Sequence, residues 1–158
     1  MSLTFGPSDC HMVVSHAWHS LNVFDGHGKL LFHSSALTSG TGGSVDNTGG
    51  DTPFGDYLVT SEIIETLPAE PWDTRAAYGP WFLGLTDLEG QESSRGRAGI
   101  GMHGGRQGDY APDPTERHLL YPTHGCIRVF DDVLSHKIVP LVRSTQAAGG
   151  RVVITVGP

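Results

Sequence analysis

The chain lacks several features that would place it at once in a common functional class. It has 10 Lys plus Arg against 17 Asp plus Glu, and its formal net charge is −7. Nucleic acids and anionic membranes are bound by clustered basic side chains, and the arginines here are scattered, so neither partner is expected. No stretch approaches the ~20 apolar residues of a membrane span, so we expect no membrane insertion. No N-terminal apolar run resembles a signal peptide, and composition alone leaves the location open.

Cysteine is also scarce, and the two present are too few for a disulfide framework. A single domain of 158 residues buries enough surface to fold without a disulfide or a metal. We expect Cys10 near a frayed end and Cys126 as a free thiol. We further expect residues 1–10 to be a flexible N-terminal segment, with residues 1–3 a candidate expression remnant, and residues 11–157 to form one domain.

Glycine and proline, by contrast, are abundant, at 22 and 10 residues, and favour a β-rich fold with long loops. Residues 11–25 alternate and are rich in β-branched and aromatic residues, which predicts a strand. A turn at residues 26–28 and a second strand from Lys29 complete a hairpin. Further strands are expected at about 56–64, 80–87, 98–103 and 151–156, with a surface loop over 39–53.

One helix is expected, beginning near Asp131 and Asp132, whose carboxylates suit a helix N-terminus. Pro140 predicts a kink or a split, and Gly149-Gly150 predicts the end. The residues expected to face the core at helical spacing are Leu134, Ile138, Leu141 and Val142. The predicted fold is mainly β and single-domain, with one helix in the C-terminal half packed on it.

The segment YPTHGCIRVFDD, residues 121–132, carries a candidate nucleophile, Cys126. A nucleophilic thiol needs activation, because an unperturbed cysteine is only a few per cent thiolate at pH 7. A neighbouring histidine can lower its pKa to roughly 3.5–7.5. His103, His118 and His124 are the candidates: His124 shares a face with the cysteine in an extended segment, whereas His103 ends a strand and is rigidly placed.

Other groups near the cysteine suit acyl transfer. The carbonyl of Gly104 is placed to hold the second nitrogen of the His103 imidazole. The N–H groups of Gly125 and Cys126 are candidates for an oxyanion hole. Arg128 offers a guanidinium suited to a substrate carboxylate. Taken alone, however, this segment favours a buried packing thiol over a nucleophile.

The remaining histidines and the tryptophans favour no separate site. On one strand His11 and His19 share a face and His16 lies on the other, which is poor geometry for a metal. We expect them on a solvated strand face, with no metal and no cofactor bound. The tryptophans suit stacking on sugars, but core packing explains them more simply: Trp18, Trp72 and Trp81.

Four motifs follow one another along the chain: LTSG at residues 37–40, TPFGDYLV at 52–59, IGMHG at 100–104 and THGCIR at 123–128. Together they resemble the L,D-transpeptidase catalytic domain (YkuD-like) family. THGCIR, residues 123–128, is similar to its [S/T]-H-G-C-hydrophobic-[R/N] signature, and IGMHG, residues 100–104, to its strand ending in His-Gly. TPFGDYLV, residues 52–59, is similar to its T-P-x-G segment, and LTSG, residues 37–40, to the turn after its opening strands. The resemblance covers most of the chain and implies a β-sandwich-like fold with a catalytic domain over residues 11–157.

The resemblance also implies a reaction and a site. Cys126 would attack the carbonyl of the third residue of a peptidoglycan stem peptide and release the terminal D-Ala. An acceptor stem's amine would then resolve the thioacyl-enzyme into a 3→3 cross-link. His103 would be the general base and the Gly104 carbonyl its orienting partner. His124, Gly125 and Cys126 would line the oxyanion region, and Thr123 and Arg128 would shape the pocket that binds the substrate.

The resemblance implies a periplasmic or cell-wall location, and carbapenem-type β-lactams as covalent inhibitors. One departure stands out: residues 104–122 form a longer segment than the family's usual spacing, and we expect a flap over the cleft. Such a flap motivates an alternative, an L,D-carboxypeptidase in which water is the acceptor. A third hypothesis is a cell-wall-binding domain with an inert thiol.

Overall fold

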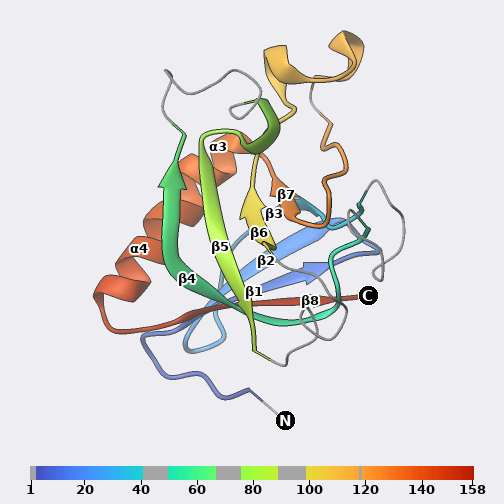
Figure 1. Cartoon of the computed structure of the whole chain (residues 1–158). Coiled ribbons are helices and arrows are strands. Elements are labelled where there is room, and N and C mark those ends of the chain that lie inside the picture. The colour runs from blue at the N-terminus through green and yellow to red at the C-terminus, as the bar shows by residue number, and fades with distance from the viewer. Residues whose placement is uncertain (1–2, 41–49, 67–75, 89–98, 118) are drawn as a thin grey trace.

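The strands of the chain form one sheet that closes on itself. A computed structural model describes residues 3–40, 50–66, 76–88, 99–117 and 119–158 (Figure 1). Neighbouring strands follow the order β1-β2-β3-β7-β6-β5-β4-β8 around a closed barrel. Their bounds are β1 Cys10–Ser15, β2 Ser20–Asp25, β3 Leu30–Leu37, β4 Gly55–Glu65, β5 Trp81–Asp87, β6 Gly101–His103, β7 Ile127–Val129 and β8 Val152–Gly157. The predicted mainly-β fold is confirmed, with the expected sandwich realised as a barrel.

The barrel interior follows from alternation along the strands. In β1 the buried side chains are Cys10, Met12 and Val14, and in β2 they are Leu21 and Val23. Alternate residues of a strand point to opposite faces, so each of these strands supplies one apolar face to a common core. β8 carries a near-continuous buried run, and it pairs in parallel with β1 and antiparallel with β4.

The single strand predicted over residues 11–25 is wrong, because it is two strands of a hairpin. β1 and β2 are antiparallel, and Cys10 pairs with Asp25. The chain reverses between Ser15 and Ser20, where His19 has a φ of 50°. This turn contains neither glycine nor proline, and the alternation continues on both sides of it, so the pattern hides the break. Cys10 is likewise not at a frayed end but buried at the start of β1.

The hairpin predicted at residues 26–28 is confirmed, and its turn is closed by Asp25. The Asp25 carboxylate accepts hydrogen bonds from the N–H groups of His27 and Lys29, and Gly28 adopts a φ of 80°. The strands expected at 56–64, 80–87 and 98–103 correspond to β4, β5 and β6. Of the loop predicted over 39–53, residues 41–49 lie outside the described residues.

The predicted helix is present and divided. It comprises α3 (Asp131–Val133), a π-helical turn (Leu134–Ile138) and α4 (Val139–Ala147), with Pro140 in the first turn of α4. Proline has no N–H and its ring crowds the preceding turn, so the helix widens just before it. The core-facing side chains are as predicted, with Leu141 half-buried: Leu134, Ile138, Leu141 and Val142. The acidic cap is not as predicted, because the N-cap is Phe130 and lacks a side-chain hydrogen bond.

The helix lies against the outside of the barrel beside β4 (Figure 1), where Gln146 Nε2 donates to the carbonyl of Thr60 at 3.1 Å. Its end is confirmed at Gly149, whose φ of 82° permits the bonds from Gly149 N to Gln146 O and from Gly150 N to Thr145 O. No helix in the described part of the chain is long and apolar enough to cross a membrane.

Candidate active site

The predicted nucleophile and the predicted base lie together because β6 and β7 are parallel neighbours. His103, at the end of β6, pairs in register with Arg128, two residues after Cys126. A cavity of about 430 Å³ opens at this edge of the barrel. It is lined by Ala77, Tyr78, Gly99, His103, Arg106, Pro122, Thr123, His124, Cys126 and Arg128. The cavity therefore gathers most of the predicted site residues, drawn from distant parts of the sequence.

His103 has a fixed tautomer. Its Nδ1 lies 2.7 Å from the carbonyl oxygen of Gly104, which accepts a hydrogen bond only, so Nδ1 carries the proton. Burial lowers the pKa of His103 to about 4, assisted by the positive charge of Arg128 and opposed by the Gly104 carbonyl. At neutral pH the ring is uncharged, and Nε2 has a lone pair available to accept a proton. The Gly104 carbonyl thus contacts the ring nitrogen that the sequence predicts it to hold.

Aromatic rings keep this imidazole dry. Tyr78 meets it edge-on with ring centroids 4.9 Å apart, and Phe82 stacks on it at 5.9 Å. His103 itself is 2% exposed. Tyr78 and Phe82 were not predicted as site residues, because nothing in the sequence pattern indicates which aromatic side chains contact a histidine of another segment.

Cys126 is a half-buried thiol on the cavity wall, and like Cys10 it forms no disulfide. Its Sγ lies 3.7 Å from the carbonyl oxygen of Gly99, within range of a weak S–H hydrogen bond. The thiol is thus accessible to a ligand of the cavity, unlike a core packing residue. Cys10 illustrates the contrast, since burial raises its pKa to about 11.

The turn that bears Cys126 is held by Thr123. The Thr123 hydroxyl accepts from the N–H of Gly125 at 3.0 Å and donates to the carbonyl of Cys126 at 2.8 Å. The N–H of Gly125, which the sequence predicts to line an oxyanion hole, is bonded to the Thr123 hydroxyl within the turn in this structure. Thr123 is 6% exposed and lines the cavity, and both hydrogen bonds of its hydroxyl lie within the turn.

The other side of the same turn is held by a residue that sequence analysis did not single out. Thr52, fully buried, donates from Oγ1 to the carbonyl of Gly125 at 2.7 Å. Its own N–H donates to the carbonyl of Thr38 at 2.8 Å, and Thr123 N donates to Ser39 O at 3.3 Å. The motif segments at 37–40, 52–59 and 123–128 therefore meet around the cysteine. The ordered occurrence of these motifs in the sequence indicated that the segments belong to one site, although it indicated no role for Thr52.

Arg128 is committed to the protein main chain. Its side chain is buried, and Nε donates to the carbonyl of Gly104 at 3.0 Å. The two terminal nitrogens donate to the carbonyls of Tyr121, Pro122 and Ala77, at 2.7, 3.1 and 2.9 Å. The guanidinium, which the sequence predicts as a ligand for a substrate carboxylate, joins three segments of the cavity wall in this structure. Burial lowers the pKa of Arg128 to about 10, so the group stays charged at neutral pH.

The glycines after His103 are required by close packing. A Cβ on Gly104 would lie 1.9 Å from Oδ1 of Asp131. The same Oδ1 accepts the N–H of Gly105 at 2.9 Å. Asp131, predicted as a helix cap, instead fixes the segment that carries the Gly104 carbonyl beneath His103.

The remaining histidines considered from the sequence lie at different places in the structure. His124 is exposed at the cavity rim, and His118 lies outside the described residues. His11 bonds to the Thr155 hydroxyl at 2.7 Å and His16 to that of Thr38 at 2.7 Å, so neither is simply solvated. Within the described ranges no group of three or more His, Cys, Asp or Glu side chains is placed to hold a metal ion.

The core placement predicted for the tryptophans holds for one of them. Trp81 packs against the core, with the Arg143 guanidinium 4.7 Å from its ring centroid. Trp18 contradicts the prediction, because it is 82% exposed in the β1–β2 turn. Trp72 lies outside the described residues.

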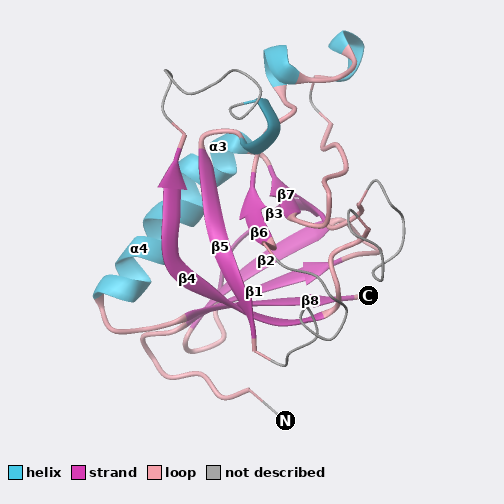
Figure 2. Ribbon diagram, in the orientation of Figure 1, coloured by secondary structure: helices cyan, strands magenta, loops and turns pink. Residues whose placement is uncertain are grey.

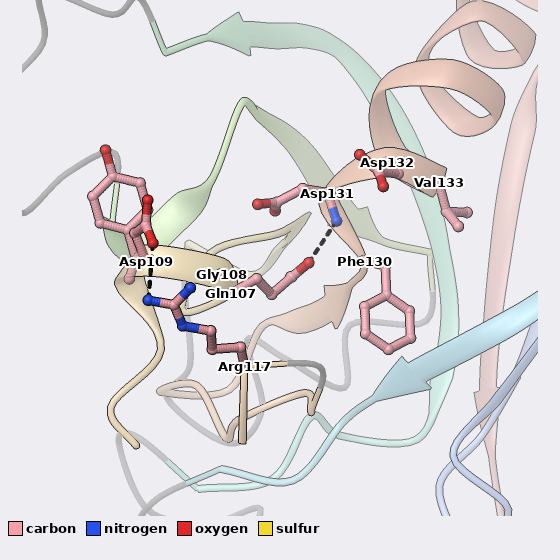
Figure 3. Close-up of a pocket in the computed structure, with 9 residues that line it drawn as sticks. Gln107, Gly108, Asp109, Arg117, Phe130, Asp131, Asp132 and Val133 are labelled. Carbon is pink, nitrogen blue, oxygen red and sulfur yellow. Dashed lines mark hydrogen bonds and ion pairs between the residues drawn. The ribbon is translucent and has the colours of Figure 1, made fainter. Parts of the chain in front are cut away.

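The long segment over residues 104–122 forms two 3-10 turns, Gly108–Tyr110 and Pro114–Glu116, which project beyond the ends of β6 and β7 (Figure 2). From this segment only Arg106 and Pro122 line the Cys126 cavity, among the residues described. Its middle part instead borders a second cavity, of about 660 Å³, next to the start of the helix (Figure 3). There Gln107 Oε1 accepts from Asp131 N at 2.8 Å, and Arg117 pairs with Asp109 at 3.0 Å. The predicted flap over the cleft is thus placed mainly beside it.

The fold is similar to those of solved bacterial proteins at low sequence identity. Bd1075 from Bdellovibrio bacteriovorus matches with a TM-score of 0.65 and 20% identity over 97% of this chain and 48% of that chain. The helical cell shape determining protein Pgp2 from Campylobacter jejuni matches with 0.55 and 18% over 94% and 47%. L,D-transpeptidase 3 from Mycobacterium tuberculosis matches with 0.51 and 16% over 97% and 62%.

These likenesses establish the fold as that of L,D-transpeptidase domains. The chain spans about half the length of the first two proteins. No family model and no curated protein matches the sequence.

Proposed function

We propose that the chain is a cysteine acyltransferase of the L,D-transpeptidase type that acts on peptidoglycan stem peptides, with residues 11–157 as its catalytic domain. The observation that carries the proposal is the shared cavity of Cys126 and His103, in which the imidazole is neutral and its Nδ1 is held by Gly104. A thiol that shares a cavity with a buried, tautomerically fixed histidine suits nucleophilic catalysis. The fold, and the order of the four motifs, support the same reaction class.

In this mechanism His103 Nε2 takes the thiol proton as Sγ of Cys126 attacks the carbonyl carbon at the third stem residue. The C–N bond to D-Ala then breaks, and the imidazolium returns its proton to the leaving amine. The thioacyl-enzyme is attacked by the side-chain amine of a second stem, which forms the 3→3 amide and breaks the C–S bond. The thiolate recovers a proton, so the enzyme ends unchanged. The expected site of action is the periplasm or cell wall.

The direct test is incubation with a tetrapeptide stem or a carbapenem, followed by intact-mass measurement. We expect an adduct on the wild-type protein and none on Cys126→Ala. His103→Ala should suppress labelling strongly, whereas His27→Ala, in the exposed turn after β2, should not. A folded wild-type protein that gives no adduct with either reagent contradicts the proposal and favours a binding domain with an inert thiol.

Product analysis separates transfer from hydrolysis at the same cysteine. With ample acceptor stem present, a 3→3 dimer supports the transpeptidase and excludes a pure L,D-carboxypeptidase. Accumulation of tripeptide alone under those conditions favours the carboxypeptidase, in which water takes the place of the amine.

A further inference from the structure

We infer that Thr52 is a positioning residue for the nucleophile: its hydroxyl selects the orientation of the Gly125–Cys126 peptide group. The inference rests on the proposed function of Cys126, and it assigns a role to a residue some 70 positions away in sequence. Thr52 is 0% exposed and touches the turn through one hydrogen bond, from Oγ1 to the Gly125 carbonyl at 2.7 Å. Thr52 acts through the main chain and not on the reacting atoms.

The geometry of the peptide bond makes this contact decisive. A peptide group is planar and trans, so its C=O and its N–H point in opposite directions. Fixing the carbonyl oxygen of Gly125 toward Thr52 therefore aims the N–H of Cys126 the other way. That N–H is one of the two predicted oxyanion donors, and the other, the N–H of Gly125, is bonded to Thr123.

Thr123 alone cannot fix this peptide group. Its hydroxyl holds the N–H of Gly125 and the carbonyl of Cys126, which belong to the peptide groups on either side. A flip of the central peptide changes ψ of Gly125 and φ of Cys126 and leaves both flanking groups in place. Gly125, with a φ of 116°, has the conformational freedom for such a flip. The Thr52 hydroxyl is the group that distinguishes the two orientations.

Thr52 is itself rigidly placed. Its N–H donates to the carbonyl of Thr38 at 2.8 Å, directly after β3. The Thr38 hydroxyl is 2.7 Å from Nδ1 of His16, in the turn after β1. The position of the hydroxyl is thus set by the barrel, which is what a precise main-chain contact requires.

The same segment offers a matched control. Tyr57, also fully buried, donates from its hydroxyl to the carbonyl of Pro53 at 2.7 Å. This bond has the same length and burial as the Thr52 bond, but it ends on a carbonyl that is not part of the Cys126 turn. Tyr57→Phe therefore removes a comparable buried hydrogen bond without releasing the Gly125–Cys126 peptide.

The experiment compares Thr52→Val, Thr52→Ser and Tyr57→Phe with wild type in three measurements. Carbapenem acylation of Cys126, by intact mass, should slow by about 10–100-fold in Thr52→Val, somewhat less than for deletion of an oxyanion donor. Iodoacetamide alkylation, which needs no oxyanion hole, should change little. Thr52→Ser should restore acylation to within a few-fold, and Tyr57→Phe should acylate as wild type even where its Tm falls as far.

The third measurement is independent of the substrate: the ¹H–¹⁵N resonance of the Cys126 amide. It should move in Thr52→Val and stay near the wild-type position in Thr52→Ser and Tyr57→Phe. An unmoved resonance in Thr52→Val, or wild-type acylation by that variant, overturns the inference. A wild type that is never acylated while the resonance moves overturns the proposed function instead and leaves the positioning role supported.

Discussion

At the scale of single residues, the candidate site is held together by side chains that bond to main-chain atoms. Thr52 and Thr123 hold the turn of Cys126, and Arg128 holds the carbonyls around it. The segments being held are rich in glycine, which supplies no side chain for packing, so their carbonyl and N–H groups are the available points of attachment. The Gly104 carbonyl is one such point of attachment, because it accepts hydrogen bonds from both His103 Nδ1 and Arg128 Nε.

Tyr78 is predicted to help keep the pKa of His103 low. Burial is the main cause of the lowered pKa of His103, and the Tyr78 ring covers the imidazole at 4.9 Å. Tyr78→Ala should admit water and raise that pKa from about 4 toward 6.5. An NMR titration of the His103 Cε1–H reports it directly. Tyr110→Ala, which alters the neighbouring cavity, should leave the titration unchanged; a His103 pKa that stays near 4 in Tyr78→Ala contradicts the explanation.

Substitution of Arg128 is predicted to lower the free energy of unfolding more than substitution of an exposed arginine. In Arg128→Lys one ammonium replaces a fork that reaches four carbonyls, so buried acceptors lose their donors. Each unsatisfied buried group costs about 1–3 kcal/mol, and we expect a loss of about 2–4 kcal/mol in the free energy of unfolding. Urea denaturation measures it. Arg143→Lys, at an exposed stacking position over Trp81, should lose under about 1 kcal/mol.

At the scale of elements, hydrophobic alternation and turn residues predicted most of the strands. The β2–β3 hairpin was predictable because Gly26 and Gly28 mark its turn, whereas the β1–β2 turn was not, because His19 adopts a positive φ that glycine usually takes. The exposed Trp18 belongs to that unmarked turn, which is why it was assigned to the core. Asp131 likewise looked like a helix cap because a cap is a local contact, and its real partner, Gly105 N, lies on another segment.

The C-terminus of α4 gives an element-scale prediction. Gly149 ends the helix with a φ of 82°, and a Cβ there would meet nothing within 4 Å. Gly149→Ala therefore isolates the cost of the left-handed conformation, which is about 1 kcal/mol of stability. Gly157→Ala, where a Cβ is equally unobstructed and φ is not left-handed, should be neutral or slightly stabilising. Thermal unfolding of the two variants decides, and equal Tm values would contradict a role for the helix-ending motif.

At the scale of the whole molecule, the site exists because barrel closure brings distant segments to one edge. The contact between Thr52 and Gly125, and that between Arg128 and Ala77, join residues far apart in sequence. Cys126 and His103 were predicted as site residues from motifs, and both line one cavity. The hydrogen bonds of Arg128 and of the Gly125 N–H could not be predicted, because an unpaired donor looks the same in a sequence as a paired one. The contacts made in the closed sheet determine which hydrogen-bond donors can bind a substrate.

The buried imidazole of His103 links this architecture to pH. Its folded pKa is about 4, against an ordinary value of 6.5, so between these pH values the unfolded chain binds a proton that the folded chain does not. The stability that His103 contributes is therefore fully present above pH 6.5 and is lost as pH falls toward 4. Each pKa unit corresponds to about 1.4 kcal/mol, which sets an upper limit on the order of 3 kcal/mol.

The measurement is the free energy of unfolding by urea at pH 7 and pH 4 for wild type and His103→Asn. Other groups titrate in both proteins, so the difference between them isolates His103. We expect wild type to lose more stability on acidification than His103→Asn, by an amount approaching the upper limit above. His33→Asn, at an exposed position of β3, should lose as much as wild type. Parallel acid losses in wild type and His103→Asn would mean that the imidazole is not held neutral by the closed barrel, and the base assigned to Cys126 would then have to be sought elsewhere.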